Sequence, residues 1–335
     1  MKALVVRLDS FGDMLLAGPA VRATAASASC VTVLCGPSGE PAARMLPGVD
    51  DVITWRAPWE GADAPAVDES DVTGLVEGLR KRAFDAALVL TSFHQSPLPT
   101  ALLLRLAGVH RIGADSVDHA GRLLDVRHHR LPDRHEAEAA LDLAHAMGFA
   151  SATADDGRLR VLPPPDTAAL TGNGPYVVVH PGASVPARSW SADRYAEAVD
   201  LLADAGHRVV VTGGPDERRL TRLVSGDVAV DLGGGTSARK LAGVLRGADV
   251  LVSRNTGPAH LAAAVGTPVV SLFAPVVPAS RWAPYGVPTV LLGDQRAQCA
   301  GTRARECPVP GHPCLNGITG QDVVSAVQKL VKEKA

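Results

Sequence analysis

Short apolar runs alternate with longer amphipathic stretches along most of this chain. The runs, rich in Val and Leu, predict buried strands, and they lie at residues 3–8, 31–35, 51–54, 86–90, 176–179, 207–212, 228–232, 249–253 and 268–273. Patterns typical of helices lie between or after them, at 71–82, 98–107, 135–147, 193–205, 216–224, 237–246 and 321–332. Strands that alternate with helices form parallel sheets from βαβ units. The chain is therefore predicted to be an α/β protein with doubly wound sheets.

A proline interrupts the first helical pattern. Residues 14–27 have a helical pattern, but Pro19 either places the helix start near Gly18 or kinks the helix. The preceding residues, 9–13, are predicted to form a tight loop at the end of the first strand.

A proline- and glycine-rich segment divides the pattern into two halves. Residues 162–174 contain three consecutive prolines followed by two glycines, a composition typical of a linker. We therefore expect an N-terminal Rossmann-like domain over 1–163 and a C-terminal one over 174–320. A last amphipathic helix, within 321–335, is expected to be able to pack back on the N-terminal domain. Two such domains place a ligand crevice between them, outside the carboxyl ends of the strands.

Composition argues against several other classes of protein. The 335 residues have a formal net charge of −2, which gives no sign of nucleic-acid binding. No apolar run reaches the roughly 18 residues of a membrane span, and the first residues predict a strand rather than a signal peptide, so we expect a cytoplasmic protein. Five cysteines in a chain of this length do not indicate a secreted disulfide framework. No Gly-x-Gly-x-x-Gly follows the first strand, so a dinucleotide redox cofactor is not expected.

Glycine and small polar residues follow the predicted strands of the second half, at 182–184, 213–214, 233–235 and 256–257. Because the carboxyl ends of parallel strands share one edge of a sheet, all four segments should point at the same crevice. The last of them lies within 253–260, between a buried strand and a short helix. Such a turn aims backbone N–H groups and the helix dipole at one point, which suits a phosphate. Taken alone, it is equally well an ordinary strand-to-helix turn.

Four segments, in this order, resemble those of glycosyltransferase family 9, the heptosyltransferase family. They are LVVRLDSFGDMLL (4–16), HPGASVPARSW (180–190), SRNTGPAHLAAA (253–264) and a C-terminal segment with Cys299, Cys307, His312 and Cys314. The resemblance covers essentially the whole chain. It implies the GT-B fold, with two Rossmann-like domains facing a central cleft. It also implies an inverting sugar transfer from a nucleotide diphosphate heptose, usually the ADP form, to an acceptor hydroxyl.

That chemistry needs a base beside the acceptor and positive charge beside the leaving diphosphate. Asp13 matches the family's general base, although Asp is also a favoured helix cap, and Asp9 is the second candidate carboxylate. Arg188 matches a basic position that contacts the donor phosphates in the family. Arginine suits this role, because a guanidinium can bind a diphosphate in bidentate fashion. A surface arginine is the alternative. Ser184 can assist, while Trp190 is expected to pack under the same loop.

The remaining donor residues also come from the resemblance. Thr256 and Gly257 match positions that hold the diphosphate, and His260 matches one near the donor, although a histidine in a first helical turn is often structural. Asn255 stands where the family usually has Asp, which keeps hydrogen bonding but removes the charge and puts the identity of the sugar in question. Glu217 matches an acid that bonds the ribose; its alternative role is to complement a helix dipole.

The acceptor is expected on the N-terminal domain, near a locally basic segment. Arg122, Arg127 and Arg130 are predicted to contact an acidic or glycosidic acceptor, with solvated surface charge as the alternative. In the family the acceptor is commonly a lipopolysaccharide core at the inner membrane face, so peripheral membrane association is compatible with the resemblance, as is glycosylation of small molecules. We expect a monomer.

Neither a metal nor a cofactor is expected. The gap between Cys299 and Cys307 is not a standard zinc spacing, and reduced thiols in a loop packed near the site are the preferred interpretation. Two other functions stay open. A nucleotide-sugar 2-epimerase shares the GT-B layout and turns over without an acceptor, and a non-catalytic sugar-nucleotide binding protein is conceivable because of Asn255.

Overall fold

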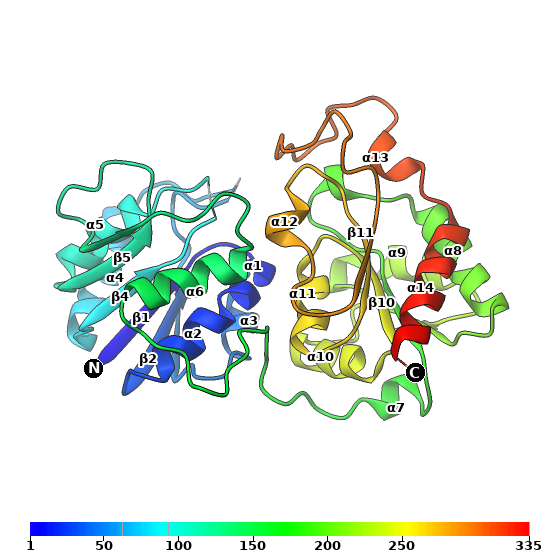
Figure 1. Cartoon of the computed structure of the whole chain (residues 1–335), viewed down its shortest axis with the longest axis horizontal. Coiled ribbons are helices and arrows are strands. Elements are labelled where there is room, and N and C mark those ends of the chain that lie inside the picture. The colour runs from blue at the N-terminus through cyan, green and yellow to red at the C-terminus, as the bar shows by residue number, and fades with distance from the viewer. Residues whose placement is uncertain (62, 93, 335) are drawn as a thin grey trace. The chain divides into compact units, whose positions relative to one another are not determined.

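The structure, a computed structural model, describes residues 1–61, 63–92 and 94–334. The chain divides into two compact units, Met1–Leu162 and Pro163–Ala335, each built on a six-stranded sheet (Figure 1). Ala335, the last residue of the expected C-terminal segment, lies outside the described residues. Across the described part of the chain, none of the helices combines the length and apolar character that a membrane span requires.

The first unit contains a parallel sheet with the strand order β3-β2-β1-β4-β5-β6. Its strands are β1 (Lys2–Arg7), β2 (Cys30–Cys35), β3 (Asp51–Thr54), β4 (Ala86–Val89), β5 (Arg111–Asp115) and β6 (Val126–His128). Its helices are α1 (Phe11–Leu16), α2 (Gly18–Ala25), α3 (Glu40–Ala43), α4 (Glu69–Arg82), α5 (Leu98–Leu106) and α6 (Glu136–Ala146). Helices α4 and α5 cover one face, where Val76, Leu79 and Leu104 share a core with Leu4 and Val6 of β1. Helices α2 and α6 pack against each other as a second layer (Figure 1).

The second unit contains a parallel sheet with the order β12-β11-β10-β7-β8-β9. Its strands are β7 (Val177–His180), β8 (Val209–Val211), β9 (Val230–Asp231), β10 (Val250–Arg254), β11 (Val269–Leu272) and β12 (Thr289–Leu292). Its α-helices are α7 (Ala168–Thr171), α8 (Ala192–Asp204), α9 (Arg218–Ser225), α10 (Ala238–Gly247), α11 (Gly257–Ala264), α12 (Ala279–Trp282), α13 (Pro313–Asn316) and α14 (Gly320–Lys334). Two 3₁₀ turns, Pro186–Arg188 and Pro215–Glu217, follow β7 and β8.

Both sheets have the same topology. When the strands of each unit are numbered from its own first strand, the order is 3-2-1-4-5-6, that of the Rossmann fold. The winding reverses between β1 and β4 in the first unit and between β7 and β10 in the second. Ligands of such sheets bind at this reversal point, outside the carboxyl ends of the strands. Each unit therefore has one favoured edge for a ligand.

The first helix begins earlier than predicted. The predicted loop 9–13 is reduced to Asp9 and Ser10, because α1 starts at Phe11 and Ser10 caps it by accepting a hydrogen bond from the Asp13 backbone N at 3.4 Å. The alternative role of Asp13 as the cap is therefore wrong, since Ser10 fills that position and Asp13 lies in the first turn. Helix α2 does start at Gly18, as predicted from Pro19, because the first turn of a helix needs no N–H from proline.

Three strands, β5, β6 and β12, differ from the sequence prediction, although only β5 and β6 lack an apolar run, since β12 reads TVLL. Strand β5 contains Gly113, where a Cβ atom would lie 2.2 Å from the Met147 sulfur, so the end of α6 packs directly on its backbone. Strands β6 and β12 are short edge strands with partly exposed side chains. Strand β9 is also shorter than the expected run 228–232. Edge strands lack the two-sided burial that produces continuous apolar sequence in parallel sheets.

The last helix belongs to the second unit. The apolar side chains of α14, including Val323, Val324, Val327 and Leu330, lie in the same core as Tyr195 of α8, and the two helices pack side by side (Figure 1). The apolar face of α14 is therefore covered by its own unit, and its packing on the N-terminal domain stays a prediction.

Candidate active site

A buried ionic cluster lies at the reversal point of the first sheet. Arg7, the last residue of β1, is only 2% exposed. Its guanidinium lies 2.7 Å from Asp9 Oδ1 and 3.2 Å from Asp13 Oδ1. It also donates to Ser92 Oγ at 3.0 Å, and Ser92 Oγ in turn donates to Asp9 Oδ2 at 3.0 Å. These contacts join the segments that follow β1 and β4.

Asp13 lies at the accessible rim of this cluster. Its side chain is 18% exposed, twice the value of Asp9. One carboxylate oxygen faces Arg7, and the other accepts a hydrogen bond from Ser10 Oγ at 2.6 Å. Each carboxylate oxygen has two lone pairs, so Asp13 can still accept a proton from a hydroxyl. Asp9 lies deeper, and both of its carboxylate oxygens are engaged, one by Arg7 and the other by Ser92, so it is the less accessible candidate base.

Two of the three predicted acceptor arginines have partners within the first unit. Arg130 binds Glu136 at 2.7 Å and Asp115 at 3.0 Å, and it donates to the Thr91 carbonyl oxygen at 2.9 Å. Arg127 donates to the carbonyl oxygens of residues 116 and 117. Arg122 is exposed in the turn before β6, at the amino end of that strand. The structure therefore does not gather these three side chains into one patch, and Arg130 holds buried acids.

Arg130→Ala is expected to lower the free energy of unfolding by about 3–5 kcal/mol, because it removes the nearest cation from the buried Glu136 and from the largely buried Asp115. Urea unfolding measures this loss, and the exposed Arg122→Ala should change stability by no more than about 0.5 kcal/mol. An Arg130→Ala protein of unchanged stability whose only defect is a higher KM for the acceptor would contradict the structural role.

Glu60 extends the cluster, and neither the sequence pattern nor the family resemblance points to it. Gln95 Nε2 donates to both carboxylate oxygens of Glu60, at 2.9 and 2.8 Å, while Gln95 Oε1 accepts from Ser92 N at 2.8 Å. A chain of hydrogen bonds thus runs from Glu60 through Gln95 and Ser92 to the Arg7 cluster. Burial, with help from the charges of Asp9 and Asp13, raises the pKa of Glu60 to about 7.

This shift predicts a pH dependence of stability. Because the pKa of Glu60 is about 7 in the folded protein and 4.5 ordinarily, the folded state holds the proton more tightly. Stability should therefore fall as the pH rises through this window. In Glu60→Gln that fall should be smaller, while in Glu77→Gln, on the exposed side of α4, it should match wild type. Urea unfolding midpoints between pH 4.5 and 8 measure this fall in stability. Parallel pH profiles for Glu60→Gln and wild type would contradict the role of Glu60.

The second unit places its predicted donor residues at the corresponding edge. Ser184 and Arg188 lie after β7, Glu217 lies after β8, and the remaining ones follow β10. These last residues are Asn255, Thr256, Gly257 and His260. Thr256 is the N-cap residue of α11, and its hydroxyl oxygen lies 3.3 Å from Ser253 Oγ. The N-terminus of α11 thus begins directly at the carboxyl edge of β10.

Two arginines connect the segments after β7 and β10. Arg188 donates to the Asn255 carbonyl oxygen at 3.1 Å. Arg254, the last residue of β10, donates to the carbonyl oxygens of Pro181 and, at 3.5 Å, Arg188. The Asn255 side chain itself points into the fold, because the residue is 4% exposed and its amide nitrogen lies 3.4 Å from the Ala274 carbonyl oxygen.

Glu217 joins the segments after β7 and β8. Its carboxylate accepts from Gly214 N at 2.7 Å and lies 3.9 Å from His180 Nε2. A Cβ atom on Gly182 would lie 1.9 Å from Glu217 Oε1, so only glycine leaves room for this contact. Burial lowers the pKa of His180 to about 4, and the ring is therefore neutral near pH 7. The Glu217 side chain remains 28% exposed, which leaves it accessible to a ligand.

A family model described as glycosyltransferase family 9 (heptosyltransferase) matches residues 72–312. The chain belongs to glycosyltransferase family 9. It is 26% identical, over its whole length, to lipopolysaccharide heptosyltransferase 1 of Escherichia coli O18:K1:H7, and the match covers 98% of that protein. This family-9 chain is accordingly a glycosyltransferase of the heptosyltransferase type.

Solved structures of the family have the same fold. A glycosyl transferase family 9 protein from Veillonella parvula matches with a TM-score of 0.78 and 17% identity, over 99% of this chain and 97% of that one. E. coli ADP-heptose lps heptosyltransferase II matches with a TM-score of 0.75 and 21% identity, over the whole of both chains. The two Rossmann-like sheets are those of the GT-B fold.

The cysteine segment of this family-9 chain packs beside the Arg188 segment. His312 Nε2 lies 3.1 Å from the Ala187 carbonyl oxygen, and Ala187 N donates to the Arg305 carbonyl oxygen at 2.8 Å. Cys299 and Cys314 are buried and unbridged, and burial, with Cys299 nearby, raises the pKa of Cys314 to about 12. The Cys314 thiol is therefore protonated at neutral pH.

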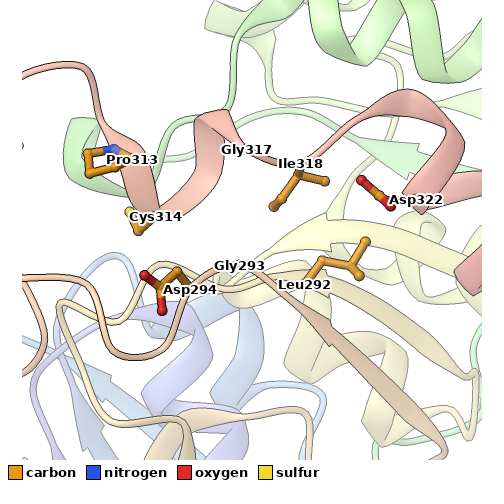
Figure 2. Close-up of a pocket in the computed structure, with 8 residues that line it drawn as sticks. All are labelled: Leu292, Gly293, Asp294, Pro313, Cys314, Gly317, Ile318 and Asp322. Atoms are coloured by element: carbon orange, nitrogen blue, oxygen red, sulfur yellow. The ribbon is translucent and has the colours of Figure 1, made fainter.

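Cys314 also lines a pocket of about 320 Å³ after β12 (Figure 2). The other lining residues are Leu292, Gly293, Asp294, Pro313, Gly317, Ile318 and Asp322. The predicted site residues are not among them, so this pocket is separate from the residues expected to bind the donor.

Proposed function

We propose that this protein transfers a heptose, or a closely related sugar, from ADP-heptose to an acceptor hydroxyl, with inversion at the anomeric carbon. The observation that carries the proposal is Asp13, a partly exposed carboxylate held by Arg7 and Ser10 at the reversal point of the first sheet. The E. coli relatives support it, one named as a lipopolysaccharide heptosyltransferase and one as an ADP-heptose heptosyltransferase.

In the proposed reaction the acceptor oxygen attacks the anomeric carbon of the donor. Asp13 takes the hydroxyl proton as the new carbon–oxygen bond forms. The bond to the diphosphate breaks, and its electron pair leaves with the diphosphate. Arg188 and the backbone N–H groups at the start of α11 stabilise that negative charge. A single displacement of this kind inverts the anomeric centre, and the proposal requires neither a metal nor a cofactor.

We further propose a glycosidic acceptor, either a lipopolysaccharide core sugar or a small-molecule glycoside. The names of the relatives favour the first. The internal ion pairs of Arg130 and the backbone contacts of Arg127 argue against these two side chains as readers of an acidic group. Any preference for a charged acceptor must then come from other residues.

A ligand screen followed by a transfer assay tests the proposal. Thermal shifts with ADP, GDP and UDP should single out ADP, and ADP-heptose with a glycoside panel should give an inverted product. A 2-epimerase would convert the donor with no acceptor present, and a binding protein would leave it intact with every acceptor. Stabilisation by UDP or GDP but not by ADP would contradict the proposed donor.

A further inference from the structure

Arg254 is a buried cation without a carboxylate partner among the described residues. It is 3% exposed, and its guanidinium donates only to backbone carbonyl oxygens, those of Pro181 and Arg188. Within the same described part of the chain, its Nε atom has no hydrogen-bond partner. The nearby acid, Glu217, is held by Gly214 N and lies beside His180.

This arrangement leaves a full positive charge inside the fold. Burial lowers the pKa of Arg254 while Tyr195 and Glu217 act in the opposite direction, but arginine stays protonated in proteins. A buried charge is costly unless an opposite charge compensates it. Carbonyl oxygens satisfy donors but carry only partial negative charge. An anion bound at this edge of the sheet would supply the missing compensation.

The position of Arg254 selects the kind of anion. It ends β10 beside β7, where the winding of the second sheet reverses, and Thr256 begins α11 two residues later. A helix N-terminus at the carboxyl edge of a parallel sheet binds phosphate groups. The guanidinium therefore lies next to the segments that suit a diphosphate.

Arg254 also fixes the backbone of a second cation. Its side chain donates to the Arg188 carbonyl oxygen, while the Arg188 side chain donates to the carbonyl oxygen of Asn255, the residue after Arg254. Each arginine thus holds the backbone of the other's segment. A change at Arg254 should displace Arg188 together with the segment that carries it.

We propose that Arg254 is a positioning residue for binding of the donor diphosphate. Arg254 holds the 181–188 segment so that Arg188 faces the phosphates, and its own guanidinium places positive charge beneath them. This inference rests on the proposed function, because it requires a nucleotide diphosphate donor. It concerns the diphosphate alone and is independent of which sugar or acceptor is used.

Arg254→Met, Arg254→Lys and Arg208→Met, made in the full chain, test the inference. Arg208 is a matched control, because it too donates to backbone carbonyl oxygens, those of Asn173 and Gly174, and packs on the Tyr176 ring. It precedes β8, at the amino edge of the sheet. Titration calorimetry with ADP, adenosine and inorganic pyrophosphate separates phosphate binding from binding of the base.

Arg254→Met should weaken ADP and pyrophosphate binding by about 10- to 100-fold, the change in affinity that corresponds to losing one hydrogen bond to a charged group. Adenosine affinity should stay unchanged, and Arg254→Lys should recover part of the loss because it keeps the charge. Arg208→Met should lower thermal stability without changing the ratio of ADP to adenosine affinity.

Equal losses for ADP and adenosine, or no loss for either, would overturn the inference. If Arg254→Met does not fold, Arg254→Lys decides, since the inference requires a selective loss of ADP affinity there too. Failure of the proposed function has a different signature. A wild-type protein that binds GDP or UDP instead of ADP refutes the donor, while pyrophosphate, which has no base, still reports on Arg254.

Discussion

Asp13→Asn is expected to lower the rate of sugar transfer by about 10²- to 10⁴-fold, the usual contribution of a general base. The amide keeps the shape of the side chain next to Arg7 and Ser10 but cannot accept the hydroxyl proton. Affinity for ADP should stay near the wild-type value, because donor binding is assigned to the second unit. Initial rates with donor and acceptor, together with ADP titrations, measure both quantities.

Two further variants make this result specific. Ser10→Ala removes the hydrogen bond to Asp13 but keeps the carboxylate, so it should slow transfer by only about fivefold, the value of one ordinary hydrogen bond. Asp9→Asn tests the second candidate carboxylate. Transfer by Asp13→Asn at more than about a tenth of the wild-type rate would refute Asp13 as the base.

Arg7→Met is expected to lower the free energy of unfolding by about 3–5 kcal/mol, the cost of removing one partner from a buried ion pair. Asp9 and Asp13 would lose the cation that contacts both, and Glu136 would lose one that lies 3.9 Å away. The loss should shrink at acidic pH, where these carboxylates can take up protons. Urea unfolding at pH 7 and pH 5 measures both effects.

A surface ion pair of the same unit supplies the control for Arg7. Arg44 pairs with Glu40 at 2.8 Å, but its side chain is 58% exposed. Arg44→Met should therefore cost no more than about 1 kcal/mol. Similar losses for the two variants would mean that burial of the Arg7 cluster contributes little to stability.

The central strands of both sheets could be predicted from sequence because they are buried on both faces. Strands such as β1 and β10 are continuous apolar runs, and the linker composition indicated two units. Edge strand β6 could not be predicted, since polar residues make up most of its short sequence, VRH, whereas the apolar run TVLL of edge strand β12 was an available signal. Strand β5 was hidden by Gly113, whose small size serves packing against Met147 rather than strand formation.

The candidate site was predicted only in part. The family resemblance pointed to Asp13 and Arg188, and the 255–257 segment was indicated both by that resemblance and by its place between a strand and a helix. The network around them depends on contacts between distant residues, such as Arg7 and Ser92, which are 85 positions apart. The basic segment that contains Arg130 was misleading, because local charge says nothing about internal partners.

One sequence signal for these contacts was present. Arg7 and Arg254 are cations at the ends of mainly apolar strand sequences, and each ends one of the two strands that border the reversal point of its unit. A charged residue in a run that predicts full burial must find partners inside the fold. Both arginines could therefore have been singled out before their partners were known.

The two arginines differ in what surrounds them, and this difference gives the two units opposite chemical character. Arg7 is outnumbered by carboxylates, so its surroundings attract protons. Among the described residues, the Arg254 guanidinium donates hydrogen bonds only to carbonyl oxygens, so its positive charge can attract an anion. In a displacement reaction the nucleophile sheds a proton while the leaving group gains an electron pair. In two sheets of the same topology, arginines on opposite sides of the reversal point would thus suit the two ends of the proposed bond exchange.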